Sequence, residues 1–128
     1  MKIRIKDNSV RLRLSQSEIR QLKELGKVVS TIQFSPYVYS TMTYRIVKSE
    51  AKHIKATFSN NRITISVPKA QIDEWANSSL VSIKYEKDIS DSQVLRILIE
   101  KDFKCLTVRP SENEEDLFPH PKVNAHNC

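Results

Sequence analysis

Glycine is almost missing from this chain of 128 residues, in which Gly26 is the single example. Phosphate-binding loops of nucleotide-binding proteins need several glycines, because their backbone must turn tightly and approach the phosphates closely. Neither a P-loop nor a dinucleotide-binding fingerprint can therefore be present. Cysteine is also scarce: Cys105 and Cys128 do not make the disulfide framework of a small secreted domain, and both are expected to be reduced thiols.

Long hydrophobic runs are absent as well. No apolar stretch approaches the roughly 18–20 residues that span a bilayer. The chain passes from Met1 directly into alternating strand-like sequence, without the apolar segment of a signal peptide. We therefore expect a cytoplasmic protein that is not bound to a membrane. The net charge of +6 is unevenly spread, since residues 1–101 are basic and residues 102–128 are acidic.

The clearest pattern that is present is a repeat with an offset of 53 residues, which aligns Asp7–Leu14 with Asn60–Val67. Apolar positions of the first segment fall on apolar positions of the second. The aligned pairs are Val10 with Ile63, Leu12 with Ile65, Leu14 with Val67, Ile19 with Ile72, Leu22 with Trp75 and Val28 with Val81. Two segments that share a hydrophobic pattern should form the same elements and bury equivalent faces.

Each copy is predicted to form a hairpin, a helix and a second hairpin. In the first copy an Asx pair joins two alternating strands, a Ser15/Glu18 capping box begins a helix from about Gln16 to Leu25, and Gly26 ends it. In the second copy a proline opens the helix. The remaining strands are expected at 28–34, 38–47, 53–58, 62–67, 81–85 and 94–99.

The predicted fold class is α+β, with two pseudo-repeated β-β-α-β-β units that form mostly antiparallel sheet or a half-barrel with two helices. We expect one domain at 1–101, with repeat halves at about 1–48 and 53–101. Residues 102–128 are expected to form an acidic, largely irregular C-terminal arm. Trp75 and the tyrosines at 37, 39, 44 and 85 are interpreted as core or strand-pair residues.

Four segments resemble a family of small uncharacterised bacterial proteins with a domain of unknown function. They are the opening MKIRIKDNSVRLRLSQSE, the central ITISVPKAQIDEWA, the run LRILIEKDFKCL and the acidic tail ENEEDLFPHP. The resemblance covers nearly the whole chain. It implies a bacterial origin and a cytoplasmic setting, and it brings no activity, substrate or site residue with it.

A row of cations in the first hairpin is the main candidate site. Side chains alternate between the faces of a strand, so Lys2, Arg4, Lys6, Arg11 and Arg13 should share the face opposite the aliphatic residues. Like charges on neighbouring strands repel. An anionic partner, such as a nucleic acid or a phosphorylated ligand, would relieve the repulsion, and so would solvent or acids from elsewhere in the chain. The favoured hypothesis is a non-catalytic, cofactor-free binding module for such a partner.

Two alternatives stay open. The protein could be a homo-oligomeric structural or adaptor protein in which strands and the acidic arm pair between subunits. It could also be a polyphosphate-binding or hydrolysing barrel similar to the triphosphate-tunnel proteins, with Glu86, Glu100 and Asp102 as its acids. The first strand lacks the alternating glutamates of that family, so its metal ligands are not expected here. Whether the protein is an enzyme is undecided, with the balance against it.

The cysteines and histidines of the tail are weak metal candidates. Cys105, His120, His126 and Cys128 are residue types that can complete a tetrahedral zinc site. Their spacing lacks the C-x2-C element that makes a zinc prediction specific. A catalytic cysteine would need Cys105 beside a base such as His53 or His120, and no local motif supports this. We therefore predict neither a metal site nor a catalytic one.

Overall fold

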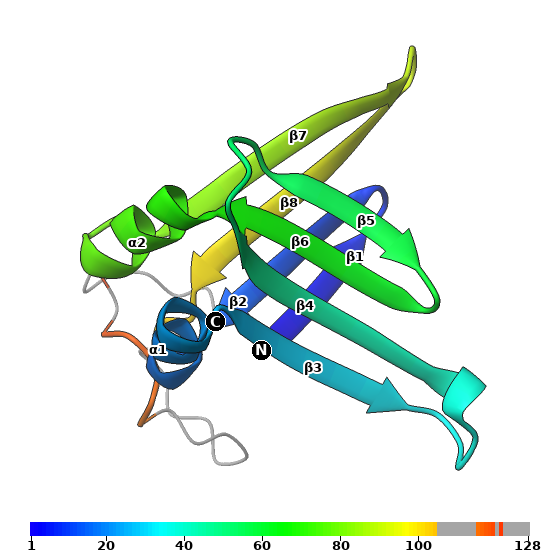
Figure 1. The fold of residues 1–128 in the computed structure, drawn as a ribbon, viewed down its shortest axis with the longest axis horizontal. Helices are drawn as coiled ribbons and strands as arrows, with labels where there is room; N and C mark the ends of the chain where they lie inside the picture. The colour runs from blue at the N-terminus through cyan, green and yellow to red at the C-terminus, as the bar shows by residue number, and fades with distance from the viewer. Residues whose placement is uncertain (105–114, 120, 122–128) are drawn as a thin grey trace. The chain divides into compact units, whose positions relative to one another are not determined.

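The computed structural model describes residues 1–104, 115–119 and 121 (Figure 1). By its internal contacts the chain divides into two compact units. Unit 1 comprises Met1 and Ile19–Leu80, and unit 2 comprises Lys2–Glu18 and Val81–Cys128. Each unit therefore draws on both predicted repeat halves, and the division into one domain and an arm stays a prediction.

Two helices and eight strands make up the described chain. In chain order the elements are β1 (Lys2–Lys6), β2 (Ser9–Leu14), α1 (Gln16–Leu25), β3 (Lys27–Gln33), the 3-10 turn η1 (Val38–Ser40), β4 (Thr41–Ser49), β5 (Lys55–Ser59), β6 (Arg62–Pro68), α2 (Lys69–Asn77), β7 (Ser82–Ser90) and β8 (Gln93–Lys101). The predicted α+β class with two β-β-α-β-β units is confirmed.

The strands form two four-stranded sheets. Sheet A, in unit 2, has the order β1-β2-β8-β7, and sheet B, in unit 1, has the order β3-β4-β6-β5. Each sheet consists of two antiparallel hairpins that meet in a central parallel pair, β2 with β8 and β4 with β6. The strands do not close into a barrel, which removes the architecture on which the polyphosphate-tunnel alternative depended.

The strand registers of the two sheets correspond at the offset of 53 residues. In the parallel pair of sheet A, Leu12 lies opposite Ile99, and in sheet B Ile65 lies opposite Ile46. The correspondence breaks in β7. Val28 faces Ile46, but the residue that faces Ile99 is Ile83 rather than the predicted Val81. Burial agrees, since Ile83 is 5% exposed and Val81 is 39% exposed.

Local signals placed α1 correctly. The Ser15 amide donates to the Glu18 carboxylate at 2.9 Å, and the Glu18 amide donates to the Ser15 hydroxyl at 3.4 Å, as a capping box requires. Gly26 follows the helix with φ +81, and its amide donates to the Leu22 carbonyl at 3.0 Å. A residue without a Cβ adopts this left-handed conformation at little cost.

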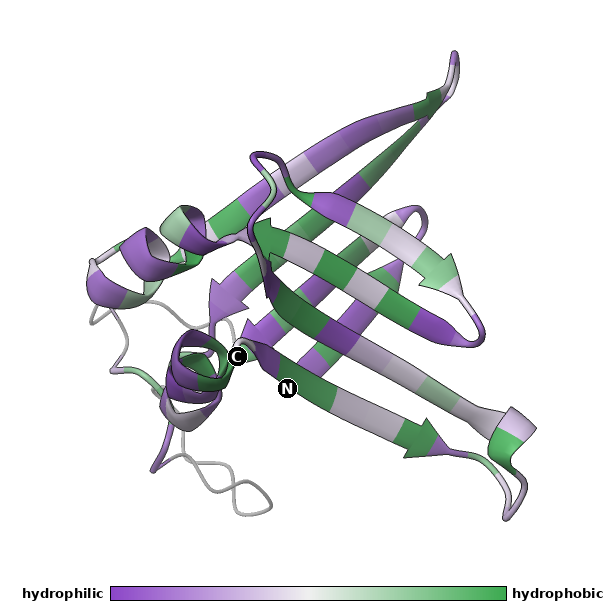
Figure 2. Cartoon of the chain, viewed as in Figure 1, coloured by the Kyte–Doolittle hydropathy of each residue, from purple (hydrophilic) through white to green (hydrophobic). Residues whose placement is uncertain are grey.

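Apolar and polar residues alternate along the strands, which gives each sheet one apolar face (Figure 2). In unit 2 the buried apolar residues of sheet A are Leu12, Leu14, Ile83, Ile97 and Ile99. In unit 1, helix α2 packs against β4 and β6, and its Trp75 is fully buried. The other buried strand residues of unit 1 are Val28, Tyr44, Ile46, Ile65 and Val67.

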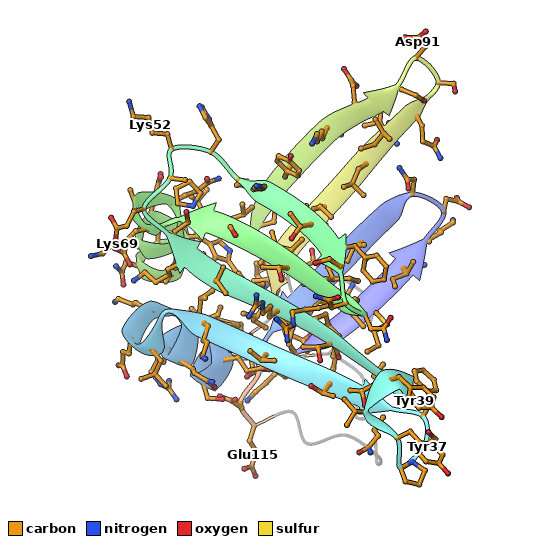
Figure 3. All side chains as sticks on the ribbon, turned by 45° about the vertical axis from the view of Figure 1, so that its right-hand side comes forward. Tyr37, Tyr39, Lys52, Lys69, Asp91 and Glu115 are labelled. Carbon is orange, nitrogen blue, oxygen red and sulfur yellow. The ribbon has the colours of Figure 1, made fainter. Side chains whose placement is uncertain are left out.

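The loop between β3 and β4 differs from the prediction. A strand was expected from residue 38, but Val38–Ser40 forms a 3-10 turn in which the Ser40 amide donates to the Tyr37 carbonyl at 3.0 Å. Tyr37 and Tyr39 are 59% and 74% exposed, and their rings stack on each other with centroids 5.4 Å apart. Their interpretation as core or strand-pair residues is therefore wrong. Figure 3 shows both at the far end of this loop.

The described part of the C-terminal arm docks on unit 2. The Asp116 carboxylate accepts hydrogen bonds from the amide and the hydroxyl of Ser17 in the first turn of α1. Leu117 is buried, and Phe118 forms a parallel bridge with Phe103. Among the described residues, no helix is both long enough and apolar enough to cross a membrane.

Candidate anion-binding face of sheet A

The polar face of sheet A, which we call the basic face, is rich in cations. It carries Lys2, Arg4, Lys6, Arg11, Arg13, Lys84 and Arg96. The first five come from the β1–β2 hairpin, where strict alternation turns them away from Ile3, Ile5, Val10, Leu12 and Leu14. The acids on the same face are Glu86, Asp88 and Glu100. Cations therefore outnumber acids on this face by about two to one.

The register of β1 and β2 sets like charges directly opposite each other. Lys2 pairs with Arg13, and Arg4 pairs with Arg11. Such cross-strand pairs lie about 5 Å apart at Cβ and destabilise a sheet by roughly 0.2–1 kcal/mol each unless something neutralises them. The predicted repulsion between these strands is therefore built into the register.

Acids of the same unit neutralise one end of the basic face. Asp102 lies 3.0 Å from the Lys2 ammonium, and Glu100 lies 2.7 Å from the Arg13 guanidinium and 3.6 Å from that of Arg11. These ion pairs hold Lys2, Arg13 and, at the longer distance, Arg11 to acids of the chain itself. At this end of the basic face, acids from elsewhere in the chain therefore relieve the repulsion, as the alternative to anion binding predicts.

The middle row of the basic face contains no acid. It runs across the sheet as Arg4, Arg11, Leu98 and Lys84. Arg4 and Lys84 are exposed, and neither forms an ion pair with any described residue. The next row contains Arg96, which lies 3.4 Å from Glu86 at a site where both side chains are more than half exposed. Ion pairs this exposed are worth little, so Arg96 is available to another anion at small cost.

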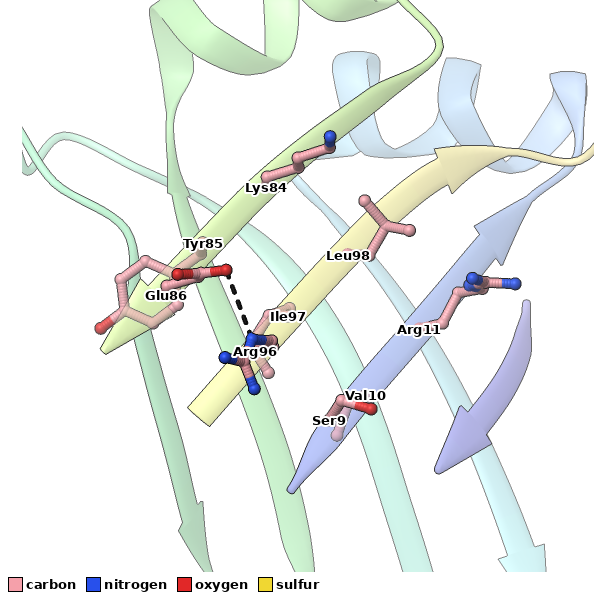
Figure 4. A pocket seen from close by; sticks show the side chains of 9 residues that line it. All are labelled: Ser9, Val10, Arg11, Lys84, Tyr85, Glu86, Arg96, Ile97 and Leu98. Atoms are coloured by element: carbon pink, nitrogen blue, oxygen red, sulfur yellow. Dashed lines mark ion pairs between the residues drawn. The ribbon is translucent and has the colours of Figure 1, made fainter. Parts of the chain in front are cut away.

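A hollow of about 320 Å³ lies along these rows, lined from β2, β7 and β8. Figure 4 shows Arg11, Leu98 and Lys84 in one line across the three strands, with Arg96 and its ion pair to Glu86 beside them. Leu98 is the apolar residue between the cations, and the Ser9 hydroxyl already donates to the Lys6 carbonyl at 2.6 Å. Guanidinium and ammonium groups around an open hollow are donors that bind phosphate oxygens.

The polar face of sheet B provides a contrast within the same chain. It carries Lys27, Arg45, Lys55 and Arg62, and the register sets no two of them directly opposite each other. Their cross-strand neighbours are Val29, Val47 or hydroxyl residues, and Arg45 donates to the Thr64 hydroxyl at 2.9 Å. This face therefore stores no cross-strand repulsion, although it is also basic.

Lys84 and Arg96 were not identified from the sequence as site residues. They join the basic face because β8 pairs in parallel with β2, and β7 pairs with β8. The alternation in β8 places Arg96 and Leu98 on the face opposite Ile97 and Ile99, so the sequence indicates which face they occupy. The sequence does not indicate which hairpin lies beside β2, because pairing between distant segments leaves no local signal.

The tail residues proposed as weak metal candidates, Cys105, His120, His126 and Cys128, lie outside the described residues. Within the part of the chain that the structure describes, no cluster of three or more histidine, cysteine, aspartate or glutamate side chains could hold a metal ion. Glu86, Glu100 and Asp102, the acids of the polyphosphate alternative, each form an ion pair with a cation.

Comparison with known proteins identifies a family for the chain, and that family has no known function. The chain belongs to a family of unknown function (DUF7009), which matches residues 1–122. The resemblance to an uncharacterised family is thereby confirmed. No curated protein and no solved structure matches the chain.

Proposed function

We propose that the protein is a non-catalytic binding module whose basic face holds the phosphate groups of an anionic partner. The observation that carries this proposal is the acid-free row Arg4, Arg11, Leu98 and Lys84, in which two arginines are directly opposed. A bound phosphate would convert a repulsive pair into two favourable charge-assisted contacts. Sheet B, whose cations are separated by uncharged residues, gains less from the same ligand.

The partner could be a nucleic acid or a phosphorylated small molecule, since both present phosphates. Among the described strands of sheet A, no aromatic side chain shares the basic face, because Tyr85, which borders the hollow, alternates to the other side of β7. A face without aromatic rings cannot stack bases, so binding should depend on phosphate density and not on base sequence. We expect a single-stranded oligonucleotide and inorganic polyphosphate to compete for the same site.

The experiment compares two triple variants that remove equal charge. Arg4→Gln/Lys6→Gln/Arg11→Gln removes three cations of the β1–β2 hairpin from the basic face. Lys27→Gln/Lys55→Gln/Arg62→Gln removes three cations from the polar face of sheet B. Arg13 is kept because its guanidinium lies 2.7 Å from Glu100, closer than that of Arg11 at 3.6 Å.

Fluorescence anisotropy with a labelled single-stranded oligonucleotide, repeated across salt concentrations, measures binding. Each lost phosphate contact should flatten the slope of log K against log salt by about 0.7, so the basic-face variant should lose about 1–2 units. The sheet B variant should keep the wild-type slope. Equal losses in both variants would show an effect of net charge alone and would overturn the assignment to sheet A. Inorganic polyphosphate added as a competitor should displace the labelled oligonucleotide if both bind the same site. Phosphate release measured in the same samples should stay at background if the protein does not hydrolyse polyphosphate.

We also propose that the chain arose by internal duplication and works in the bacterial cytoplasm. The matching registers of the two parallel strand pairs support the duplication. The near absence of cysteine supports a reducing compartment. If the two halves of related sequences did not align with each other at an offset of 53 residues, this would argue against duplication. Recovery of the protein from the medium or from membranes of expressing cells would argue against the location.

A further inference from the structure

The four edge strands of the two sheets are protected to different degrees. An edge strand presents unpaired N–H and C=O groups, and natural proteins discourage pairing there with charges, short strands or bulges. In sheet A, β1 is five residues long and three of them are cations, while β7 carries four charges and a register break between Asp88 and Ser90. In sheet B, β5 is five residues long and begins with Lys55.

Strand β3 lacks these protections. It has seven residues, and Lys27 at its start is its single charge. The segment that follows, 28–34, contains neither a charged residue nor proline. Of the four edges, β3 is the one whose sequence does nothing to prevent another strand from pairing with it.

The hydrogen-bonding pattern shows which groups of β3 point to the open edge. The Lys48 amide donates to the Gly26 carbonyl at 2.8 Å, and the Phe34 amide donates to the Ser40 carbonyl at 2.9 Å. Because hydrogen-bonded pairs alternate in an antiparallel ladder, the even-numbered residues of β3 bond to β4. The amides and carbonyls of Val29, Thr31 and Gln33 therefore face outward, and no described residue bonds them.

An exposed aromatic surface lies beyond the end of β3. Phe34, just after β3, is 73% exposed, and Phe58 on β5, the opposite edge strand of sheet B, is 70% exposed. Together with Tyr39 and Met42 they line a hollow of about 320 Å³. An aromatic side chain offers roughly 150–250 Å², so Phe34, Tyr37, Tyr39 and Phe58 leave about 400–700 Å² exposed. A standard interface buries about 800 Å² per partner, and apolar patches of about 300–600 Å² on a monomer are often functional.

We propose that β3 is a dimerisation edge at which a second copy of this chain pairs antiparallel to it. The edge is self-complementary, as a two-fold interface requires. With Ser30 opposite its own copy, Val28 faces the partner's Ile32 and Val29 faces the partner's Thr31. Lys27 then faces the partner's Gln33, so the one charge of the strand does not meet itself. This register uses all seven residues and bonds the outward amides.

The occupant is a second copy because residues 28–33 of the edge carry no charge that would select a different partner. Two copies of a chain of net charge +6 repel each other, and this strand, whose single charge lies at its start, keeps that repulsion small. Dimerisation here leaves the basic face of sheet A unused, so it is independent of the proposed anion binding.

Light scattering after size-exclusion chromatography, over a range of concentrations, tests the proposal. The wild-type chain should run at about twice its mass of 14.8 kDa. Val29→Lys/Thr31→Lys places lysines opposite each other across the interface and should raise the dimer dissociation constant more than about tenfold. The matched control, Thr57→Lys/Ser59→Lys, adds the same charge to the same face at the β5 edge and should remain dimeric.

A second variant separates a lost interface from a lost fold. Thr31→Pro removes one outward amide without breaking a backbone bond to β4, although it loses the exposed hydroxyl contact of Thr31 with Thr43 at 3.4 Å. Edge strands tolerate proline at such positions. This variant should be monomeric with an unchanged far-ultraviolet circular dichroism spectrum. A monomeric wild-type chain at all concentrations would overturn the proposal, and so would dimers that survive both β3 changes. The Arg4→Gln/Lys6→Gln/Arg11→Gln variant should lose anion binding but stay dimeric. A failure of the dimerisation proposal can therefore be distinguished from a failure of the anion-binding proposal.

Discussion

Glu100→Gln should make the protein bind anions more tightly, because Glu100 is an internal competitor for the arginines of the basic face. Its carboxylate lies 2.7 Å from Arg13 and 3.6 Å from Arg11, and its side chain is 17% exposed. Glutamine keeps the shape and a hydrogen-bond acceptor but removes the charge. Both guanidinium groups then become available to an external phosphate.

The size of the effect follows from this geometry. Removing one negative charge about 4 Å from a bound phosphate is worth about 1 kcal/mol in water-like surroundings, or roughly fivefold in the dissociation constant. One or two additional arginine–phosphate contacts should steepen the slope of log K against log salt by about 0.7–1.4. The same change removes a half-buried ion pair and should lower the unfolding free energy by about 1 kcal/mol.

Anisotropy with the labelled oligonucleotide measures the first effect, and urea denaturation measures the second. Glu24→Gln, on the exposed side of α1, removes the same charge away from the basic face and serves as the control. The reasoning predicts tighter and more salt-sensitive binding for Glu100→Gln alone. A folded Glu100→Gln variant with unchanged or weaker binding would refute it.

Two further predictions concern stability. Asp116→Ala removes the acceptor for the Ser17 amide at the start of α1 and should lower the unfolding free energy by about 1 kcal/mol; an unchanged urea midpoint, relative to a Glu74→Ala control, would contradict this. Burial lowers the pKa of Lys101 below its ordinary value of 10.5, so the folded state binds fewer protons than the unfolded state and the unfolding free energy should rise as the pH approaches 10.5. Lys101→Met should lack that part of the rise in urea denaturation at about pH 7, 9 and 10, and parallel curves for the two proteins would contradict the assignment.

Local elements of the fold were predictable because their signals are contained in a few neighbouring residues. The Ser15/Glu18 capping box and Gly26 predicted the limits of α1, and alternation predicted which residues of β1 and β2 share a face. The first hairpin turn was also predictable, because an Asx residue tolerates the positive φ of a tight turn, and Asp7 adopts φ 50. In each case the residue type itself restricts the backbone or selects the face.

The composition of the candidate site was only half predictable, because it depends on pairing between distant strands. Arg13 and Glu100 are 87 positions apart, and no local pattern reveals that β8 lies beside β2. The same pairing adds Lys84 and Arg96 to the basic face. The parallel register also decides that Arg13 is neutralised while Arg4 is not. The cations were thus readable from alternation, and their partners were not.

The prediction was wrong for Tyr37 and Tyr39, in the loop between β3 and β4. Aromatic residues are common in strands and are usually buried, so the sequence favoured a buried strand here. The loop instead makes a 3-10 turn after Pro36, and its rings stack on each other at the surface. Hydrophobic composition alone does not say whether a residue is covered by its own chain or is left for a partner.

A nuclear magnetic resonance titration with inorganic polyphosphate tests the binding role of the basic face most directly. Nitrogen–proton spectra of backbone amides and arginine side chains report where the anion binds, residue by residue. We predict that the largest shifts fall on Arg4, Arg11, Lys84 and Arg96, with small shifts on the polar face of sheet B. Shifts centred on Arg45 and Arg62, or none at all at low salt, would contradict it.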